Sequence, residues 1–222
     1  VRLLPLSLSL LVFAAGIPRV FPDISPRRVI RLGFMALFAG LVLLVGLLDV
    51  GSGPEIITWP LLLAGAGLGA MASQLGSVTV SAVPDEKSGE VGGLQNTGTQ
   101  LGDSIGTALA GALLISALTA SFFTSVQGNP DIPDRLASKA QTELASGVPF
   151  VSDAQLETAL SEARVPPATA EATVNANEEA RIDGLRAAVS VLALMALAAL
   201  AFTGGIPTVQ PGSESKPSAA PA

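Results

Sequence analysis

The amino-acid sequence predicts an all-α protein, a polytopic transmembrane helix bundle of about five spans. The first observation is the composition: 49% of the 222 residues are hydrophobic, the mean hydropathy is +0.57 and 14% are charged. Soluble proteins carry about 25% charged residues. The second observation is that four apolar segments, and a marginal fifth, have the length of about 17–25 residues that a membrane span needs. The third is that the segments between them differ sharply in charge.

The residue types that the sequence lacks exclude several classes of function. The chain contains no His and no Cys, which removes disulfide scaffolds, Cys-based zinc sites, thiol nucleophiles and mechanisms with a histidine base. The sequence shows no nucleophile and base arrangement, phosphate-binding glycine loop or metal-ligand spacing, so we expect no enzyme activity, no cofactor and no metal. The acidic pI of about 4.6 and the lack of a basic patch with interleaved aromatic residues argue against nucleic acid as a partner.

The five expected spans divide the chain into regions. They cover residues 3–18, 30–48, 57–81, 92–121 and 184–206. The first four form a transmembrane part, 1–121, which is followed by a loop, 122–183, the last span, and a Pro-, Ser- and Ala-rich tail, 207–222, that we expect to be disordered. A signal peptide is the competing interpretation of residues 1–18. Arg2 alone in its basic region and the further spans that follow favour a membrane span.

Lys and Arg near the span ends predict the orientation in the membrane. Four arginines lie after the first span: Arg19, Arg27, Arg28 and Arg31. The segment 49–56, by contrast, has no Lys or Arg. Because basic residues near span ends favour the cytoplasmic side, we expect a multi-pass protein of the plasma membrane, with the N-terminus of this chain outside and the C-terminus in the cytoplasm. The 122–183 loop would then be extracytoplasmic.

The 122–183 loop carries the acidity of the protein. It holds 10 acidic and 4 basic residues, a net charge of −6, and the remaining 8 acidic and 8 basic residues cancel. Ser152 and Gln155 have the form of a capping box before a short helix over 153–163. Pro166 and Pro167 favour a new helix start, and the polar run after them leads into the last span. We therefore expect a long helix that leaves the membrane rather than a separately packed domain.

Glycines recur every four residues in two of the expected spans. They are Gly98, Gly102 and Gly106 in the span 92–121, and Gly65 and Gly69 in the span 57–81. Because this spacing puts small residues on one helix face, a neighbouring backbone can approach closely there. We expect both stripes to be helix-packing surfaces. A moving contact between helices and static packing are equally compatible with the spacing.

A polar stripe lies beside the glycines of the span 92–121 and consists of Asn96, Gln100, Asp103 and Thr107. Such groups cannot face lipid at low cost, since a charged residue costs about 2.5–3.5 kcal/mol at the centre of a span. We expect them to line a cavity, with Asp103 as the candidate for proton coupling because a partly desolvated carboxyl group can exchange protons near neutral pH. Hydration at the cytoplasmic end, or a structural pair with an Arg, is the alternative for Asp103. Gln74 is a further cavity-lining candidate, or forms an interhelical hydrogen bond.

The segment from Val83 to Ala108 resembles the cytoplasmic loop and penultimate span of major facilitator superfamily transporters, and more narrowly the fourteen-span drug/proton antiporter branch of the EmrB/QacA type. Asp23, Arg27 and Arg28 are similar to that superfamily's short cytoplasmic loop, in which an Asp and paired basic residues lock neighbouring helices. This sequence departs from the pattern at Ser25 and Pro26, where a Gly is usual. It also departs at Asp103, where the family has a small residue, so that the coupling role of Asp103 rests on membrane physics alone.

The resemblance implies a partial major-facilitator fold and a proton-coupled exporter of small amphipathic molecules that works by alternating access. Since the chain starts at Val1 within an apolar run, it implies that about nine spans precede this segment. The expected partners are the lipid bilayer, a small-molecule substrate, protons and those N-terminal spans. The alternative is a non-transporting membrane protein whose 122–183 segment is an extracytoplasmic interaction module.

Overall fold

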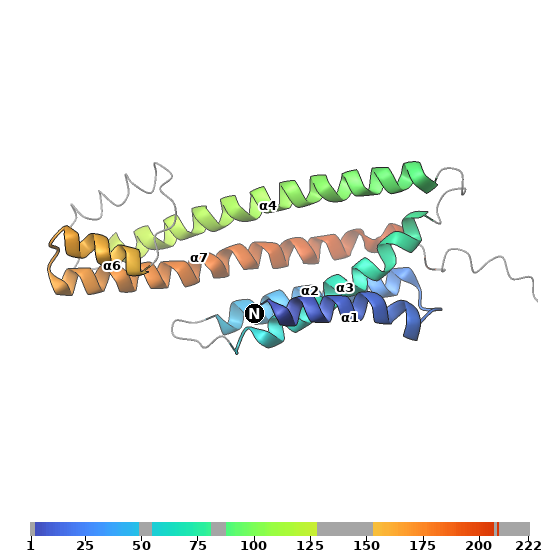
Figure 1. Ribbon diagram of the computed structural model, residues 1–222, viewed down its shortest axis with the longest axis horizontal. Coiled ribbons are helices and arrows are strands. Elements are labelled where there is room, and N and C mark those ends of the chain that lie inside the picture. Colours follow the sequence, from blue (N-terminus) through green and yellow to red (C-terminus); the bar gives the residue numbers. More distant parts are fainter. Residues whose placement is uncertain (1–2, 49–54, 81–87, 128–152, 207, 209–222) are drawn as a thin grey trace, which may run out of the picture. The chain divides into compact units, whose positions relative to one another are not determined.

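The computed structural model describes residues 3–48, 55–80, 88–127, 153–206 and 208 (Figure 1). Its helices are α1 (Leu4–Val20), α2 (Pro26–Leu47), α3 (Thr58–Val80), α4 (Ser88–Gln127), α6 (Asp153–Glu162) and α7 (Pro167–Ala201), which ends in the 3-10 turn η2 (Phe202–Gly205). Within these residues the structure contains no strand, which confirms the all-α fold class. The chain forms two compact units. The first contains α1, α2, α3, the start of α4, the end of α7 and η2, and the second contains the rest of α4, α6 and most of α7.

Helices occupy all five segments in which spans are expected. Among the described residues, three stretches are long and apolar enough to cross a membrane, namely Pro26–Leu47, Gly89–Thr124 and Pro167–Gly205. The apolar α1 has 17 residues. The 23 residues of α3 include no charged side chain, and at about 1.5 Å per residue they extend over about 34 Å, comparable with the hydrocarbon core of a bilayer.

The α2 helix begins earlier than the span expected over 30–48, because Ser25 and Pro26 form a helix start. The Arg28 backbone N–H lies 3.4 Å from the Ser25 hydroxyl oxygen, which accepts from it as an N-cap, and 2.9 Å from the Ser25 carbonyl oxygen. Pro26 occupies the first helical position, where its missing N–H costs nothing. Arg27 and Arg28, expected in a loop, therefore lie in the first turn of α2.

Close backbone contacts hold α3 between α1 and α2 in the first unit. A Cβ atom added at Gly65 would collide with Ser9 and with the Leu6 carbonyl of α1, and one at Gly69 would collide with the Leu10 carbonyl. On the α2 side, a Cβ at Gly67 would lie 2.5 Å from the Gly33 carbonyl oxygen. Only glycine permits such an approach, so these positions fix how tightly the three helices pack.

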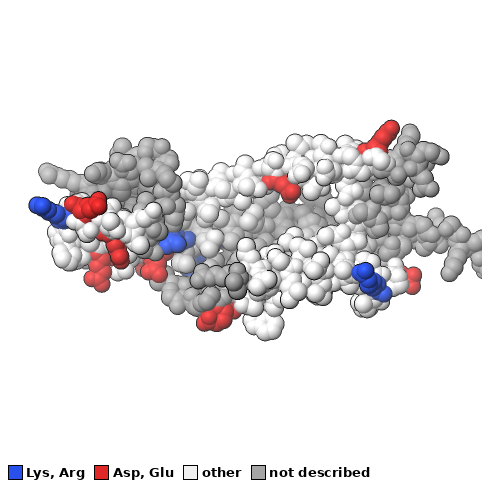
Figure 2. Space-filling view, in the orientation of Figure 1, with Lys and Arg blue, Asp and Glu red and all other residues white. Residues whose placement is uncertain are grey.

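In the second unit, α6 and the first part of α7 carry much of the acidic charge (Figure 2). The α6 helix spans Asp153–Glu162 and so is one residue shorter than expected. It ends in a Schellman motif: Arg164 has a φ of 52°, and the Val165 N–H donates to the Leu160 carbonyl at 3.1 Å. The long α7 begins at Pro167, as the Pro pair predicts. Ser152 of the expected capping box and most of the 207–222 tail lie outside the described residues.

Candidate functional site

The polar face of α4 is exposed in the structure. Asn96, Gln100, Asp103 and Thr107 lie on one side of the helix and are all exposed. No described residue of α4 is buried. Within the described part of the chain, the side chains of Asn96, Gln100 and Asp103 form no hydrogen bond. Their hydrogen-bonding capacity is therefore available to water, a substrate or another protein segment.

Several hydroxyl groups of α4 are satisfied by their own helix. The Ser104 hydroxyl donates to the Gln100 carbonyl at 2.8 Å, and the Thr97 and Thr99 hydroxyls donate to carbonyls four residues earlier at 2.9 and 3.0 Å. Such bonds let Ser and Thr occupy an apolar environment without an outside partner. The side chains of Asn96, Gln100 and Asp103 have no such bond within the described residues and need an outside partner.

Two further stripes run along other faces of α4. The glycine stripe consists of Gly98, Gly102 and Gly106, and at each of them an added Cβ would meet nothing within 4 Å. On the side opposite the polar stripe, Leu94, Leu101, Ile105 and Leu109 are exposed apolar residues. At about 100° per residue the apolar stripe lies roughly 150° from the polar one. In a bilayer, therefore, the apolar stripe suits lipid, whereas the polar stripe needs water or protein.

Gln74 of α3 occupies a different environment from the α4 residues. Its side chain is buried, with 2% of its surface exposed, and its Nε2 donates to the Ser73 hydroxyl at 3.2 Å. It lies one turn after Ala70, whose Cβ faces Gly33 of α2. The structure thus does not bring Gln74 to the surface that Asn96, Gln100, Asp103 and Thr107 share, and its cavity-lining role stays a prediction.

Arginines of α2 contact the end of α7 in the first unit. The Arg27 Nε donates to the Thr203 carbonyl at 3.3 Å, and the Arg31 Nε donates to the Thr203 hydroxyl at 2.9 Å. Thr203 is 2% exposed and its hydroxyl donates back to the Leu200 carbonyl at 2.7 Å. Guanidinium groups are favourable at this place because the end of a helix presents unsatisfied carbonyls and a partial negative charge.

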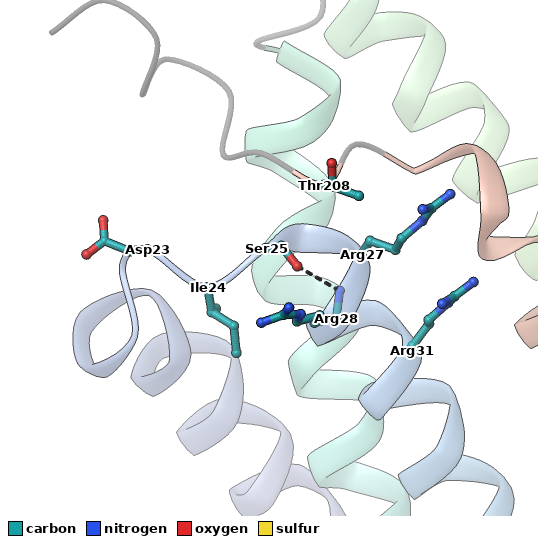
Figure 3. Close-up of a pocket in the computed structure, with 7 residues that line it drawn as sticks. All are labelled: Asp23, Ile24, Ser25, Arg27, Arg28, Arg31 and Thr208. Carbon is teal, nitrogen blue, oxygen red and sulfur yellow. Dashed lines mark hydrogen bonds between the residues drawn. The ribbon is translucent and has the colours of Figure 1, made fainter.

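These arginines also line a polar pocket of about 400 Å³ together with Asp23, Ile24, Ser25 and Thr208. Figure 3 shows Arg27 and Arg31 extending to the same side, while Arg28 points toward Ile24 and Asp23 lies beyond it. Within the described residues, Asp23 forms no ion pair with any of the three arginines. The helix-locking role that the resemblance implies for Asp23, Arg27 and Arg28 stays a prediction, and the observed partner of Arg27 is Thr203.

A second arginine contact lies in the second unit. Arg186 of α7 donates from Nε to the Leu48 carbonyl at 3.0 Å, and its Nη2 reaches the same oxygen. Its Nη1 pairs with Asp183 at 3.0 Å. Leu48 directly follows α2, so Arg186 satisfies a helix-end carbonyl, as the α2 arginines do.

Sequence reasoning did not single out Thr203 and Arg186. The sequence nevertheless contains a signal for each of these two residues. Arg186 is a cation at the start of an apolar run, and Thr203 is a hydroxyl residue at its end, just before Gly204 and Gly205. Polar groups at the two ends of a predicted span are candidates for contacts with the ends of neighbouring helices.

The described residues contain no group of three or more His, Cys, Asp or Glu side chains that could hold a metal ion. The polar groups of α4 and of the arginine pocket offer hydrogen bonds and charge.

The chain is similar to a curated protein of Escherichia coli (strain K12) named "Uncharacterized transporter YebQ", with 37% identity over 83 residues. The matched segment is 37% of this chain and 18% of that relative, so the match covers less than a fifth of the relative's length. No protein-family model matches the chain. No solved structure matches it either. The similarity to a transporter and the several apolar helices together indicate a multi-pass membrane protein.

Proposed function

We propose that this chain is part of a proton-coupled secondary transporter that exports small amphipathic molecules across the plasma membrane by alternating access. The observation that carries the proposal is the polar stripe of α4. A carboxylate and two amides without a hydrogen-bond partner among the described residues lie on a helix that is long and apolar enough to cross a membrane.

Membrane energetics link this stripe to a cavity. An Asp at the centre of a span costs about 2.5–3.5 kcal/mol when it faces lipid, and each unsatisfied amide adds to that cost. The cost disappears where the stripe borders water or protein. With Leu101 and Ile105 toward lipid, α4 forms a wall with a wet side and a lipid side. A solute path near the middle of the membrane needs such a wall.

The glycine stripe of α4 supports motion of a neighbouring helix along this wall. At Gly98, Gly102 and Gly106 no atom of the described chain occupies the space beside the backbone, so the face can receive another helix at short distance. Alternating access needs contacts of this kind, since one group of helices rocks against another around the solute site.

Further support comes from the named transporter that shares 37% identity with the chain over 83 residues and from the resemblance of the segment between Val83 and Ala108 to drug/proton antiporters. In this proposal Arg27, Arg28 and Arg31 lie at the cytoplasmic surface, the N-terminus of the chain is outside and the C-terminus is cytoplasmic. The chain moves its substrate without covalent chemistry and is not an enzyme.

The test is Asp103→Asn in cells that express the transporter containing this chain. The substitution keeps the size and polarity of the side chain and removes its exchangeable proton. We expect export driven by a proton gradient to fall to background and its dependence on pH to disappear, while substrate binding persists. Glu90→Gln is the matched control on the same helix, since Glu90 lies in the first turn of α4, and we expect it to leave export unchanged. Intact, pH-dependent export by Asp103→Asn rules out the coupling role.

A second candidate function rests on the α6 and α7 region. Six acidic residues of this region have described side chains that are exposed or half-buried: Glu157, Glu162, Glu171, Glu178, Glu179 and Asp183. An exposed acidic helix pair is suited to hold a basic partner, as an extracytoplasmic interaction module would. This function predicts no proton-driven export. Substrate efflux that stays the same after collapse of the proton gradient would therefore favour it over the transporter.

A further inference from the structure

The first turns of α2 concentrate positive charge that the described residues do not neutralise. Arg27, Arg28 and Arg31 line one pocket. Within the described part of the chain none of the three forms an ion pair. The pocket also borders the N-terminal end of α2, where the helix dipole adds a partial positive charge. The carboxylate of Asp23 also lines the pocket, but three guanidinium groups outweigh it, so the net charge of the pocket is positive and suits an anion.

The arginine donors are arranged for an oxygen-rich anion. Arg27 and Arg31 each use Nε on Thr203, and because a guanidinium has five N–H groups, the Nη groups of both remain for a ligand. Figure 3 shows the two side chains extending to the same side, one turn apart. Parallel N–H groups from two guanidinium forks match the oxygens of a phosphate group. The side chain of Arg28 makes no hydrogen bond within the described residues and supplies a third charge at the edge.

The surface below the pocket is apolar. Along α2, Leu32, Met35 and Val42 follow Arg28 at i+4, i+7 and i+14 and are 55%, 46% and 47% exposed. This spacing puts them on one helix face. α2 is long and apolar enough to cross a membrane. In that placement its first turn lies at the depth of lipid phosphates and this face lies beside acyl chains. A ligand with a phosphate head and apolar tails fits both surfaces.

We propose that this pocket binds the phosphate group of an anionic phospholipid, with Arg27 and Arg31 on the phosphate oxygens, Arg28 at the edge and the acyl chains along Leu32, Met35 and Val42. The site does not depend on transport, so binding alone tests it.

The experiment uses the full 222-residue chain, purified, delipidated and placed in nanodiscs of phosphatidylcholine with a minor share of phosphatidylglycerol. Native mass spectrometry counts the lipids that stay bound. We expect selective retention of phosphatidylglycerol. We expect its affinity to fall about five-fold for each guanidinium removed, in Arg28→Gln and, with a larger loss, in the double variant Arg27→Gln/Arg31→Gln.

Four comparisons make the result decisive. Arg28→Gln removes no hydrogen bond of the described chain, so its effect does not come from misfolding, and Arg28→Lys should retain most of the binding. Arg19→Gln removes one charge outside the pocket and should leave the affinity unchanged. An equal loss in Arg19→Gln would show diffuse attraction and overturn the site, as would equal retention of phosphatidylcholine and phosphatidylglycerol. Displacement of short-chain phosphatidylglycerol by inorganic phosphate at matching concentration would overturn the assignment to a lipid.

Discussion

The helices α3 and α4 carry the same kind of glycine spacing and meet opposite surroundings. In α3, Gly65, Gly67 and Gly69 have the backbones of α1 and α2 against them, at distances that no side chain would permit. In α4, Gly98, Gly102 and Gly106 have nothing within 4 Å of an added Cβ. The difference teaches that glycine spacing specifies a surface for close approach, whereas the presence of a partner has to be found in the structure.

The polar residues of the two helices differ in the same way, since those of α3 have a neighbour in the structure and those of α4 have none among the described residues. Gln74 of α3 is buried and donates to Ser73, while Asn96, Gln100 and Asp103 of α4 are exposed. We interpret α3 as the structural core of the first unit. We interpret α4 as the functional helix, with a polar stripe that borders water and a glycine stripe that can receive another helix.

The largest expected effect is the response of the two helices to Gly→Ala. At Gly67 the new methyl group would lie 2.5 Å from the Gly33 carbonyl oxygen and 2.7 Å from the Leu37 nitrogen. Because both are backbone atoms, the helices have to separate, and we expect a loss of about 1–3 kcal/mol in the free energy of unfolding. Gly102→Ala meets nothing and should stabilise α4 by up to about 1 kcal/mol through helix propensity. Unfolding of the reconstituted chain in a denaturing detergent measures both, and similar losses at the two positions would refute the comparison.

A smaller effect tests the same contrast for charged groups, between a residue with a partner in the structure and one without. Arg186→Gln removes the hydrogen bonds to the Leu48 carbonyl and the pair with Asp183, and we expect a loss of about 1–2 kcal/mol in the same measurement. Arg186→Lys should recover only part of it, since an ammonium cannot reproduce the guanidinium fork. Asp103→Asn should leave the stability of the chain unchanged. A stability loss for Asp103→Asn as large as that for Arg186→Gln would make Asp103 a structural residue.

The smallest expected effect lies at the end of α6, outside both helices of the comparison. Arg164 has a φ of 52°, a left-handed conformation that costs a residue with a Cβ about 1–2 kcal/mol. Arg164→Gly should therefore stabilise the helix end by about 1 kcal/mol, visible as slower hydrogen exchange of the α6 amides. Arg164→Ala removes the charge and keeps the strain. If it slows exchange as much as glycine does, charge and not backbone strain is the cause.

Much of this fold follows from periodicity and apolar length. The helices, the start of α7 at Pro167 and the glycine faces are local properties, because capping chemistry and residue spacing act within a few residues. Even so, α2 begins at Pro26 rather than near 30, since the cap at Ser25 outweighs the polarity of the arginines.

The candidate site was predictable only in part. The polar face of α4 follows from spacing, but the contacts of Arg27 and Arg31 with Thr203 join residues separated by 176 and 172 positions. Local patterns contain no information about which helix ends meet. For the same reason, spacing could not distinguish the buried Gln74 from the exposed Gln100.

The central claim is that the polar face of α4 borders water inside the membrane. The chain has no cysteine, so single thiols can be introduced by Thr107→Cys on the polar stripe and by Ile105→Cys on the apolar stripe, two residues away. A membrane-impermeant thiol reagent is applied to membranes that contain the transporter. We predict that the thiol at position 107 reacts at least about ten-fold faster than the thiol at 105, because only a hydrated thiol forms the reactive thiolate. Equal rates, or faster reaction at 105, would contradict the claim.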